Sequence, residues 1–465
     1  MPAEAVLGAA DYALVDAKLS DTDRLLRRSY PGDDGSRQPV HTVYVPADRI
    51  EPALAGRWGG EALAAVEASG GMEALCRTVG LPGNLVAPIA AKVEAKLLRE
   101  PIEDLRLDFE DGYGGRSDDE EDAAALDAAE LFARAVDGGT APPFAGIRFK
   151  SFEEPTRARG IRTLDLFLSR LLRQGNLPAG LTLTLPKVST VAQVEAMAYV
   201  CGRLEKSHGL EPGRLRFEVQ VETPQLILGA DGTAPVARLL HAGSGRVSGL
   251  HYGTYDYSAS LEIPAGNQAM DHPAADYAKA VMQVAAAGTG VRLSDGSTNI
   301  LPVGSAENTA AAWVLHARLV RRSLERGYYQ GWDLHPAQLP TRFIATYSFY
   351  LSGFDAAASR LRNYVHRSES TVLDEPATAR ALARFLQRGL DCGALDGQDI
   401  EQRTGVDPAQ LARLAHPRPA HSPLAEPRSG AAAASGTTPA SGPGTTPAAA
   451  PSVVSDPSRR PEGPS

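Results

Sequence analysis

Cysteine, aromatic residues and long apolar runs are all scarce in this chain of 465 residues. Its three cysteines, Cys76, Cys201 and Cys392, lie far apart without a CxxC pair or a Cys/His cluster, so we expect neither a disulfide framework nor a zinc site. No stretch approaches the roughly 18 apolar residues of a membrane span, and the first residues lack the basic and then apolar pattern of a signal peptide. The sequence therefore predicts a cytoplasmic protein that does not contact a membrane.

Positive charge is also in short supply. The formal net charge is −9, and no basic cluster is longer than Arg321-Arg322 or Arg459-Arg460. A nucleic-acid-binding protein needs a basic face, so we expect no nucleic-acid partner. With 43% hydrophobic and 22% charged residues, the composition is that of a globular protein that can build a core without covalent cross-links.

The two ends of the chain differ in composition from its middle. Residues 416–465 include 38 that are Pro, Gly, Ala, Ser or Thr, which predicts a disordered tail because such a segment buries little apolar surface. Apolar residues at helical spacing after Pro376 predict helices over residues 375–415. We therefore expect an N-terminal helical extension (1–40), a catalytic domain (41–350), a helical appendage (351–415) and the tail (416–465).

Short β-rich runs alternate with helical stretches in the middle of the chain. Helices are expected over Glu61–Val79, Asp118–Val136 and Thr190–His208, the second after a capping-box pattern at Ser117. Eight strands alternating with helices favour a (β/α)₈ TIM barrel; an open doubly wound sheet is the alternative, but no GxGxxG follows the first strand. The expected strands are His41–Pro46, Leu105–Phe109, Phe144–Phe149, Leu181–Val188, Leu215–Val221, Arg246–Tyr252, Gly290–Leu293 and Tyr328–Leu334.

Charged residues follow these strands, where the loops of a barrel converge on one mouth. Glu222 and Asp256 come from adjacent strands and could each offer an oxygen to one divalent cation, since Mg²⁺ takes one or two protein carboxylates. Lys187 could act as an amine nucleophile, but we favour a salt bridge to the acidic cluster. The charged residues at the strand ends are Asp108, Glu110, Asp111, Arg148, Lys150, Lys187, Glu222, Asp256, Asp295, Asp333 and His335.

Two of these residues have a plain structural interpretation beside the functional one. Arg148 suits bidentate recognition of a substrate carboxylate, but it could instead pair with Asp108 or Glu110 on the neighbouring strand. His335 has the pKa range of a general base, but it precedes Pro336 after an apolar strand, which favours a hydrogen-bonded structural histidine.

Seven short stretches lie at the expected strand ends in one order along the chain. Each is weak by itself, and the seven together form a fairly specific pattern. They are Val43–Pro46 (VYVP), Leu107–Gly112 (LDFEDG), Ile147-Arg148 (IR), Leu185–Val188 (LPKV), Val221–Thr223 (VET), Gly253–Asp256 (GTYD) and His335–Gln338 (HPAQ).

In these stretches the sequence resembles the HpcH/HpaI aldolase/citrate lyase family of phosphoenolpyruvate/pyruvate-type barrels, nearest its citrate lyase β-chain-like branch. The resemblance covers roughly residues 40–345. It implies a Mg²⁺-dependent carbon–carbon lyase, with Mn²⁺ as an alternative ion, that works beside a 2-oxo acid or an acyl thioester and assembles as a homo-trimer or hexamer.

The resemblance also implies roles for individual residues. Glu222 and Asp256 match the metal ligands, and Arg148 matches the arginine that holds the oxo-acid carboxylate and the enolate oxygen. Asp108, Glu110 and Asp111 match the acidic motif that supports metal waters and neighbouring cations. We count Glu110, Asp111 and Lys187 with Arg148 as catalytic residues, and Arg148, Gly253 and Thr254 as substrate-binding.

The chain departs from the family pattern beside the metal ligands. Members that use thioesters follow the metal glutamate with E-T-A-R-G, whereas here Glu222 is followed by Thr223-Pro224-Gln225-Leu226. Tyr255 and Tyr257 flank Asp256, and an insertion spans Leu261 to Tyr277. These changes argue against coenzyme A and favour a free oxo or hydroxy acid as substrate.

The sequence thus predicts a lyase or aldolase that forms an enolate stabilised by the metal and Arg148. The base that removes the substrate hydroxyl proton stays open between a metal-bound water and a carboxylate of the Asp108–Asp111 cluster. Two alternatives stay open as well: phosphoenolpyruvate or phosphoryl-transfer chemistry on the same barrel, and a catalytically reduced barrel that only binds a metabolite.

Overall fold

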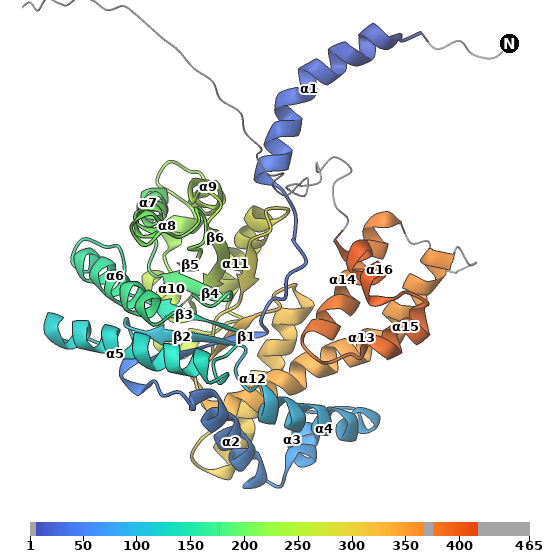
Figure 1. The fold of residues 1–465 in the computed structure, drawn as a ribbon. Coiled ribbons are helices and arrows are strands. Elements are labelled where there is room, and N and C mark those ends of the chain that lie inside the picture. Colours follow the sequence, from blue (N-terminus) through green and yellow to red (C-terminus); the bar gives the residue numbers. More distant parts are fainter. Residues whose placement is uncertain (1–5, 176, 367–374, 417–465) are drawn as a thin grey trace, which may run out of the picture. The chain divides into compact units, whose positions relative to one another are not determined.

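Eight parallel strands form the centre of the protein in a computed structural model that describes residues 6–175, 177–366 and 375–416 (Figure 1). The eight expected strands are all present, with bounds shifted by a few residues. The strands are β1 (His41–Pro46), β2 (Asp104–Asp108), β3 (Phe144–Arg148), β4 (Leu181–Leu185), β5 (Phe217–Val221), β6 (Val247–Tyr252), β7 (Arg292–Ser294) and β8 (Gly331–Asp333).

The strands close into a barrel in chain order. Each strand from β2 to β7 pairs in parallel with the one before it, and β8 pairs with β1. Between β7 and β8 the seam is closed by a bridge from Ser294 to Gln330 and by a hydrogen bond of 2.8 Å from the Asp295 amide to the Gln330 carbonyl. The predicted (β/α)₈ barrel is confirmed.

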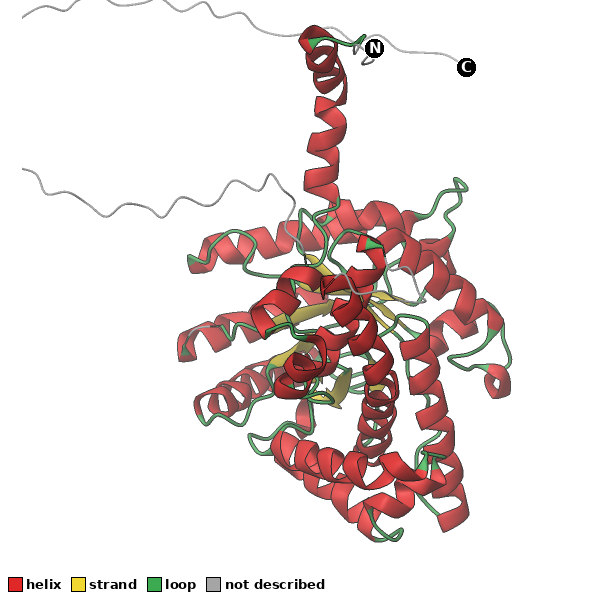
Figure 2. Cartoon of the chain, turned by 90° about the vertical axis from the view of Figure 1, so that its right-hand side faces the viewer, coloured by secondary structure: helices red, strands yellow, loops and turns green. Residues whose placement is uncertain are grey.

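Helices surround the strands (Figure 2). The helix expected over Asp118–Val136 is α5, whose Ser117 cap exchanges hydrogen bonds with Glu120. The helices are α1 (Ala9–Ser29), α2 (Leu54–Glu67), α3 (Met72–Thr78), α4 (Gly83–Arg99), α5 (Asp118–Asp137), α6 (Arg157–Gln174), α7 (Val191–His208), α8 (Pro224–Ile227), α9 (Pro235–Ala242), α10 (Thr254–Ser260), α11 (Pro273–Ala286), α12 (Ala306–Glu325), α13 (Leu339–His366), α14 (Pro376–Asp391), α15 (Gly397–Thr404) and α16 (Pro408–Ala415), with short 3₁₀ turns η1 (Ala47–Arg49), η2 (Ala265–Asn267) and η3 (Pro336–Gln338).

Two stretches differ from the sequence-based expectation. The single helix expected over Glu61–Val79 is broken into α2 and α3, because Gly70 and Gly71 adopt positive φ angles of 97° and 89° between them. The boundary expected after residue 350 falls inside α13, a continuous helix of 28 residues. Its first turns are buried against the barrel, and α14 and α15 pack on it.

Two further expectations concern the C-terminal tail and membrane-spanning helices. Residues 417–465 of the expected tail lie outside the described part of the chain. No helix within the described ranges has the length and apolar character needed to cross a membrane.

Ion pairs, rather than apolar side chains, fill the lower part of the barrel. Arg106 on β2 is buried and donates from Nη2 to Glu218 Oε2 at 2.8 Å and from Nε to Thr184 Oγ1 at 3.0 Å, and it also pairs with Asp104. His251 on β6 contacts the same Glu218 oxygen, with 3.0 Å between Nε2 and Oε2. This paired network lies below the residues that continue the same strands to the mouth.

Candidate active site

The carboxyl ends of β2 to β6 bring most of the predicted site residues to one mouth. Asp108 and Arg148 are the last residues of β2 and β3, and Glu222 follows β5 directly. Asp256 is in the first turn of α10, the helix that follows β6. Parallel strands in register therefore gather chain segments that are far apart in sequence.

Arg148 is held by Asp108 across the β2–β3 pair. Its Nε and Nη2 atoms each donate to one Asp108 oxygen at 2.7 Å. The Asp108 oxygens also accept from the amides of Glu110, at 3.0 Å, and Gly112, at 2.8 Å, which fixes the loop after β2. The guanidinium fork that we expected to bind a substrate carboxylate is therefore occupied by Asp108. Nη1 is the Arg148 nitrogen that does not donate to Asp108, and it lies 3.4 Å from Glu110 Oε2.

Lys187 ties the acidic loop to the end of β5. Its Nζ lies 2.5 Å from Glu110 Oε1 and 2.7 Å from Asp111 Oδ1, which confirms the salt bridge favoured from the sequence. Its φ of 51° is unusual for a residue other than glycine. In this conformation its backbone amide donates to Glu222 Oε2 at 3.0 Å, so one residue orients three carboxylates.

Glu222 is deeply buried at the mouth, with 2% of its surface exposed. Burial raises its pKa to about 8, and the negative charges of Asp256 and Glu110 add to the shift against the opposing pull of Arg148. Burial also raises the pKa of Asp256. Neighbouring carboxyls that resist ionisation in a buried site are stabilised when a cation binds between them.

Glu110 and Asp111 form an unequal pair. Burial raises the pKa of Glu110 above its usual range, against the pull of Arg148. For Asp111 burial acts in the same direction, but hydrogen bonds and the charges of Arg148 and Lys187 outweigh it and lower the pKa. Of the two, Glu110 is the carboxyl able to carry a proton near neutral pH.

Gly253 and Thr254 link β6 to Asp256. A Cβ atom on Gly253 would overlap Cγ of Glu222 and lie 2.6 Å from its Oε1, so the Glu222 side chain requires glycine here. The hydroxyl of Thr254 is buried and has no hydrogen-bond partner in the described residues. A Cβ atom added to Gly296 would lie 2.1 Å from this oxygen, so the Thr254 hydroxyl packs against the loop after β7.

The donor set fits a hard divalent cation with few protein ligands. In the described part of the chain no three His, Cys, Asp or Glu side chains are arranged to enclose a metal. Glu222 and Asp256 supply two carboxylates, and Mg²⁺ commonly takes one or two and completes its shell with water and substrate oxygens. A transition metal that prefers nitrogen or sulfur ligands finds neither in this pair.

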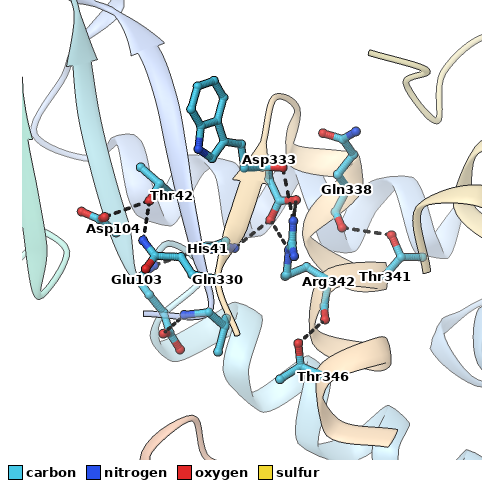
Figure 3. Close-up of polar contacts among 12 residues, drawn as sticks. His41, Thr42, Glu103, Asp104, Gln330, Asp333, Gln338, Thr341, Arg342 and Thr346 are labelled. Atoms are coloured by element: carbon cyan, nitrogen blue, oxygen red, sulfur yellow. Dashed lines mark hydrogen bonds and ion pairs between the residues drawn. The ribbon is translucent and has the colours of Figure 1, made fainter. Parts of the chain in front are cut away.

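Three charged residues at strand ends face away from the mouth. Asp295 accepts from Lys279 Nζ at 3.0 Å and from Ser323. Asp333 accepts from Arg342 and contacts His41 at 2.8 Å, outside the barrel (Figure 3). His335 accepts the Ala337 amide at 3.1 Å, as expected for a structural histidine.

Two polar residues inside the barrel were not predicted from the sequence. Tyr44 on β1 lies 4.7 Å below the Arg148 guanidinium and accepts from Gln220 Nε2 at 3.2 Å across the barrel. Gln220 is buried, and its Oε1 has no partner in the described residues. Tyr44 and Gln220 stand two residues before Pro46 and Glu222, so each shares a strand face with a residue at the mouth. This spacing could have predicted that both side chains point into the barrel.

Comparison with solved structures confirms the fold. A citrate lyase from Burkholderia xenovorans LB400 is 18% identical, with a TM-score of 0.52, over 78% of this chain and 96% of that one. A Haloferax volcanii malate synthase in complex with magnesium and glyoxylate is 15% identical over 82% and 98% of the two chains, with a TM-score of 0.43. A Mycobacterium tuberculosis citrate lyase beta subunit in complex with oxaloacetate and magnesium is 17% identical over 67% and 98%, with a TM-score of 0.38.

Sequence comparison identifies the family more directly. No curated protein matches the chain. One family, described as a domain of unknown function, DUF6986, matches residues 19–419, which include the barrel and the helices after it. The chain therefore belongs to the DUF6986 family.

Proposed function

We propose that this protein is a Mg²⁺-dependent carbon–carbon lyase or aldolase that acts on a 2-oxo acid or its hydroxy adduct. The observation that carries the proposal is the pair Glu222 and Asp256, two carboxyls with raised pKa at adjacent strand ends beside Arg148. The citrate lyase with the same fold supports a lyase of this kind. We also propose membership of the wider HpcH/HpaI aldolase/citrate lyase group on the seven sequence stretches.

Glu222 and Asp256 would hold the cation, either Mg²⁺ or Mn²⁺. The bound cation would supply electrophilic activation of the 2-oxo group. The chain itself orients these ligands: the Lys187 amide donates to Glu222, and Gly253 leaves room for the Glu222 side chain. These two contacts fix the buried Glu222 carboxylate, so this ligand needs no rearrangement on binding.

Arg148 would contact the substrate through Nη1 while Asp108 holds its other two nitrogens. A single charge-assisted hydrogen bond from a buried guanidinium can stabilise a carboxylate or a developing enolate oxygen. Tyr44 lies under the guanidinium and limits its movement toward the barrel interior. Arg148 would therefore present one nitrogen to the substrate in a fixed direction, and Asp108 would act as its positioning residue.

Glu110 would move the proton of the substrate hydroxyl. Its raised pKa suits a group that accepts a proton in bond cleavage and returns it in the reverse direction. Asp108 is less suited because Arg148 and two backbone amides occupy its oxygens. Lys187 would act by holding Glu110 and Asp111 in place, as its two short contacts indicate.

The substrate would be a free acid. Glu222 is followed by Thr223 and by α8, which begins at Pro224, so the arginine of thioester-using members has no counterpart there. Phosphoryl transfer is not favoured, because the solved structure of the same fold that supports the proposal is a citrate lyase. A homo-oligomer, a trimer or hexamer, remains part of the proposal on the sequence resemblance.

Steady-state turnover of 4-hydroxy-2-oxo acids and of oxaloacetate with Mg²⁺ tests the proposal. Glu222→Gln and Asp256→Asn keep side-chain shape, so each should fold and lose about 10²–10³ in kcat. The double variant should be little worse than either single one, because residues that serve one ion act as a unit. Glu153→Gln, an exposed carboxylate whose charge also reaches Asp256, is the control and should retain turnover. Wild-type turnover that survives a chelator would show that the metal assignment is wrong.

A further inference from the structure

Helix α1 exposes apolar side chains that no other residue in the described part of the chain covers. All residues from 9 to 28 are exposed, and Ser29 is the one buried residue of this 21-residue helix. An isolated helix of this length is marginal in water, and its four aspartates are poor helix formers. The helix therefore needs packing that comes from outside the described chain.

Four of the six exposed large apolar residues of α1 follow a heptad pattern, whereas Leu25 borders this pattern and Leu14 lies outside it. Tyr12, Val15, Leu19 and Leu26 are 48–59% exposed, and with Thr22 they alternate at spacings of three and four. We call these five residues the α1 seam. A narrow stripe of this spacing is the sequence pattern of a coiled coil and is matched by a second helix with the same repeat.

Charge excludes one other occupant of the seam, and a lack of aliphatic residues excludes a second. Four Asp and four Lys or Arg residues make α1 neutral, whereas a helix that lies on an anionic lipid surface carries mostly Lys and Arg on its polar face. Residues 417–465 of this chain offer only Leu424, Val453 and Val454 as large aliphatic residues, too few to fill a seam of two and a half heptads. A helix with complementary heptads remains.

The charges beside the seam fit a second copy of α1 in parallel orientation. Lys18 and Asp23 occupy the g and e positions, and neither makes an ion pair within the described residues. In a parallel pair Lys18 of one copy faces Asp23 of the other, on both sides of the seam. An antiparallel pair would bring Asp16 and Asp23 together. Only Asp11 and Asp16 oppose each other in the parallel pair, near the helix N-terminus, where negative charge is tolerated.

We propose that the α1 seam forms a parallel coiled coil with α1 of a second copy of this chain. This contact is independent of the proposed catalytic function. It joins copies through a segment that precedes the barrel, whatever contacts the barrels themselves make. The residues that form it are Tyr12, Val15, Leu19, Thr22 and Leu26, flanked by Lys18 and Asp23.

Sedimentation and light scattering of the full chain test the pairing. Leu19→Asp with Leu26→Asp should lower the molar mass at micromolar concentration and weaken association by about 10² or more, because two apolar residues become charged in the seam. Ala10→Asp with Ala17→Asp adds the same charge to the opposite face of the helix and should leave the mass unchanged. Equal masses for wild type and both variants would overturn the proposal.

A cysteine placed in the seam tests the orientation. Thr22→Cys faces its own copy in a parallel pair, so mild oxidation should give a disulfide-linked dimer, whereas Lys18→Cys should not. The three native cysteines are buried and free, so they leave the assay clear. No cross-link, or binding to phosphatidylserine vesicles that the seam variant loses, would show that another surface covers α1.

Discussion

At the scale of single residues, the buried carboxyl of Glu222 should control metal affinity through its proton. Its pKa is raised to about 8, chiefly by burial. A protonated carboxyl cannot ligate Mg²⁺, so below this pKa the apparent affinity should fall about tenfold per pH unit, and above it the affinity should level off. Calorimetric titration with Mg²⁺ between pH 6 and 9 measures this dependence.

The matched variants separate Glu222 from its neighbours. Glu222→Gln should bind Mg²⁺ weakly at every pH, without the steep dependence, whereas Glu153→Gln should reproduce the wild-type curve. A wild-type affinity that is flat between pH 6 and 8 would contradict the assignment. Proton release on Mg²⁺ binding, measured in two buffers of different ionisation enthalpy, gives an independent check.

The pair of Asp108 and Arg148 should contribute to stability as well as to the site. Both residues are buried, and Asp108→Asn removes the charge that compensates the guanidinium. Breaking one side of a buried ion pair costs about 3–5 kcal/mol, so urea unfolding should show a loss of that order. Asp48→Asn breaks the exposed pair with Arg116, at 3.2 Å, and should cost about 0–1 kcal/mol. Similar losses for the two variants would contradict this account.

The sequence predicted which charged residues end strands but not which way each one points. Glu222 and Asp256 face the mouth, whereas Asp295 and Asp333 face the surrounding helices. Side chains alternate between the inside and the outside of the barrel along a strand. After the strand ends, the turn decides toward which side the next side chain points. The direction therefore depends on partners such as Lys279 and Arg342, which lie on neighbouring helices, 16 and 9 residues away in the sequence.

At the scale of elements, the junction of β6 and α10 should no longer hold Glu222 in place when Gly253 gains a side chain. The added Cβ in Gly253→Ala would overlap Glu222, so that side chain must move. We expect Mg²⁺ affinity to fall at least about tenfold, since ligand geometry decides affinity at a two-carboxylate site. The measurement is calorimetry with Mg²⁺, beside a thermal melt that reports on folding.

Gly266→Ala is the control for this junction. It lies in η2 after α10, and a Cβ atom there meets nothing within 4 Å. The control should keep both Mg²⁺ affinity and Tm. If Gly253→Ala binds Mg²⁺ as the control does, the Glu222 side chain has room that the packing does not indicate.

Strand positions were predicted better than helix boundaries. The eight apolar runs are short and bounded by turn residues, so β1 to β8 follow from the local pattern. The division of one expected helix into α2 and α3 depends on the positive φ of Gly70 and Gly71, which a helical spacing of apolar residues does not reveal. The continuity of α13 across the expected boundary depends on packing on both sides of the helix.

At the scale of the whole molecule, closure of the barrel relies on polar contacts as much as on apolar packing. Asp333 at the end of β8 contacts His41 at the start of β1 and Arg342 on α13 (Figure 3). It also contacts His316 on α12. Gln330, just before β8, donates to Thr42 Oγ1 at 2.8 Å. These contacts join the two ends of the barrel sequence, and hydropathy patterns give no sign of them.

This network predicts how stability depends on pH. His316 is buried and neutral, with Nε2 3.0 Å from Asp333 Oδ1 and Nδ1 2.8 Å from Thr341 Oγ1. Burial lowers its pKa below the usual value, so as pH falls below about 6.5 the unfolded chain takes up a proton that the folded protein does not. The contribution of His316 to stability should therefore be complete above this pH and fall by up to about 1.4 kcal/mol per unit below it.

Urea unfolding between pH 7.5 and 5 tests the dependence. Against the effect of burial, Arg342 and the two histidines lower the pKa of Asp333 well below its usual value. The stability that this carboxylate contributes is therefore lost only under more acidic conditions. His316→Gln should be less stable at pH 7.5 and should lose less stability on acidification. His241→Gln, at an exposed position on α9, should follow the wild-type slope. Parallel curves for wild type and His316→Gln would mean that another group governs acid sensitivity, because the two proteins differ only in the group that takes up this proton.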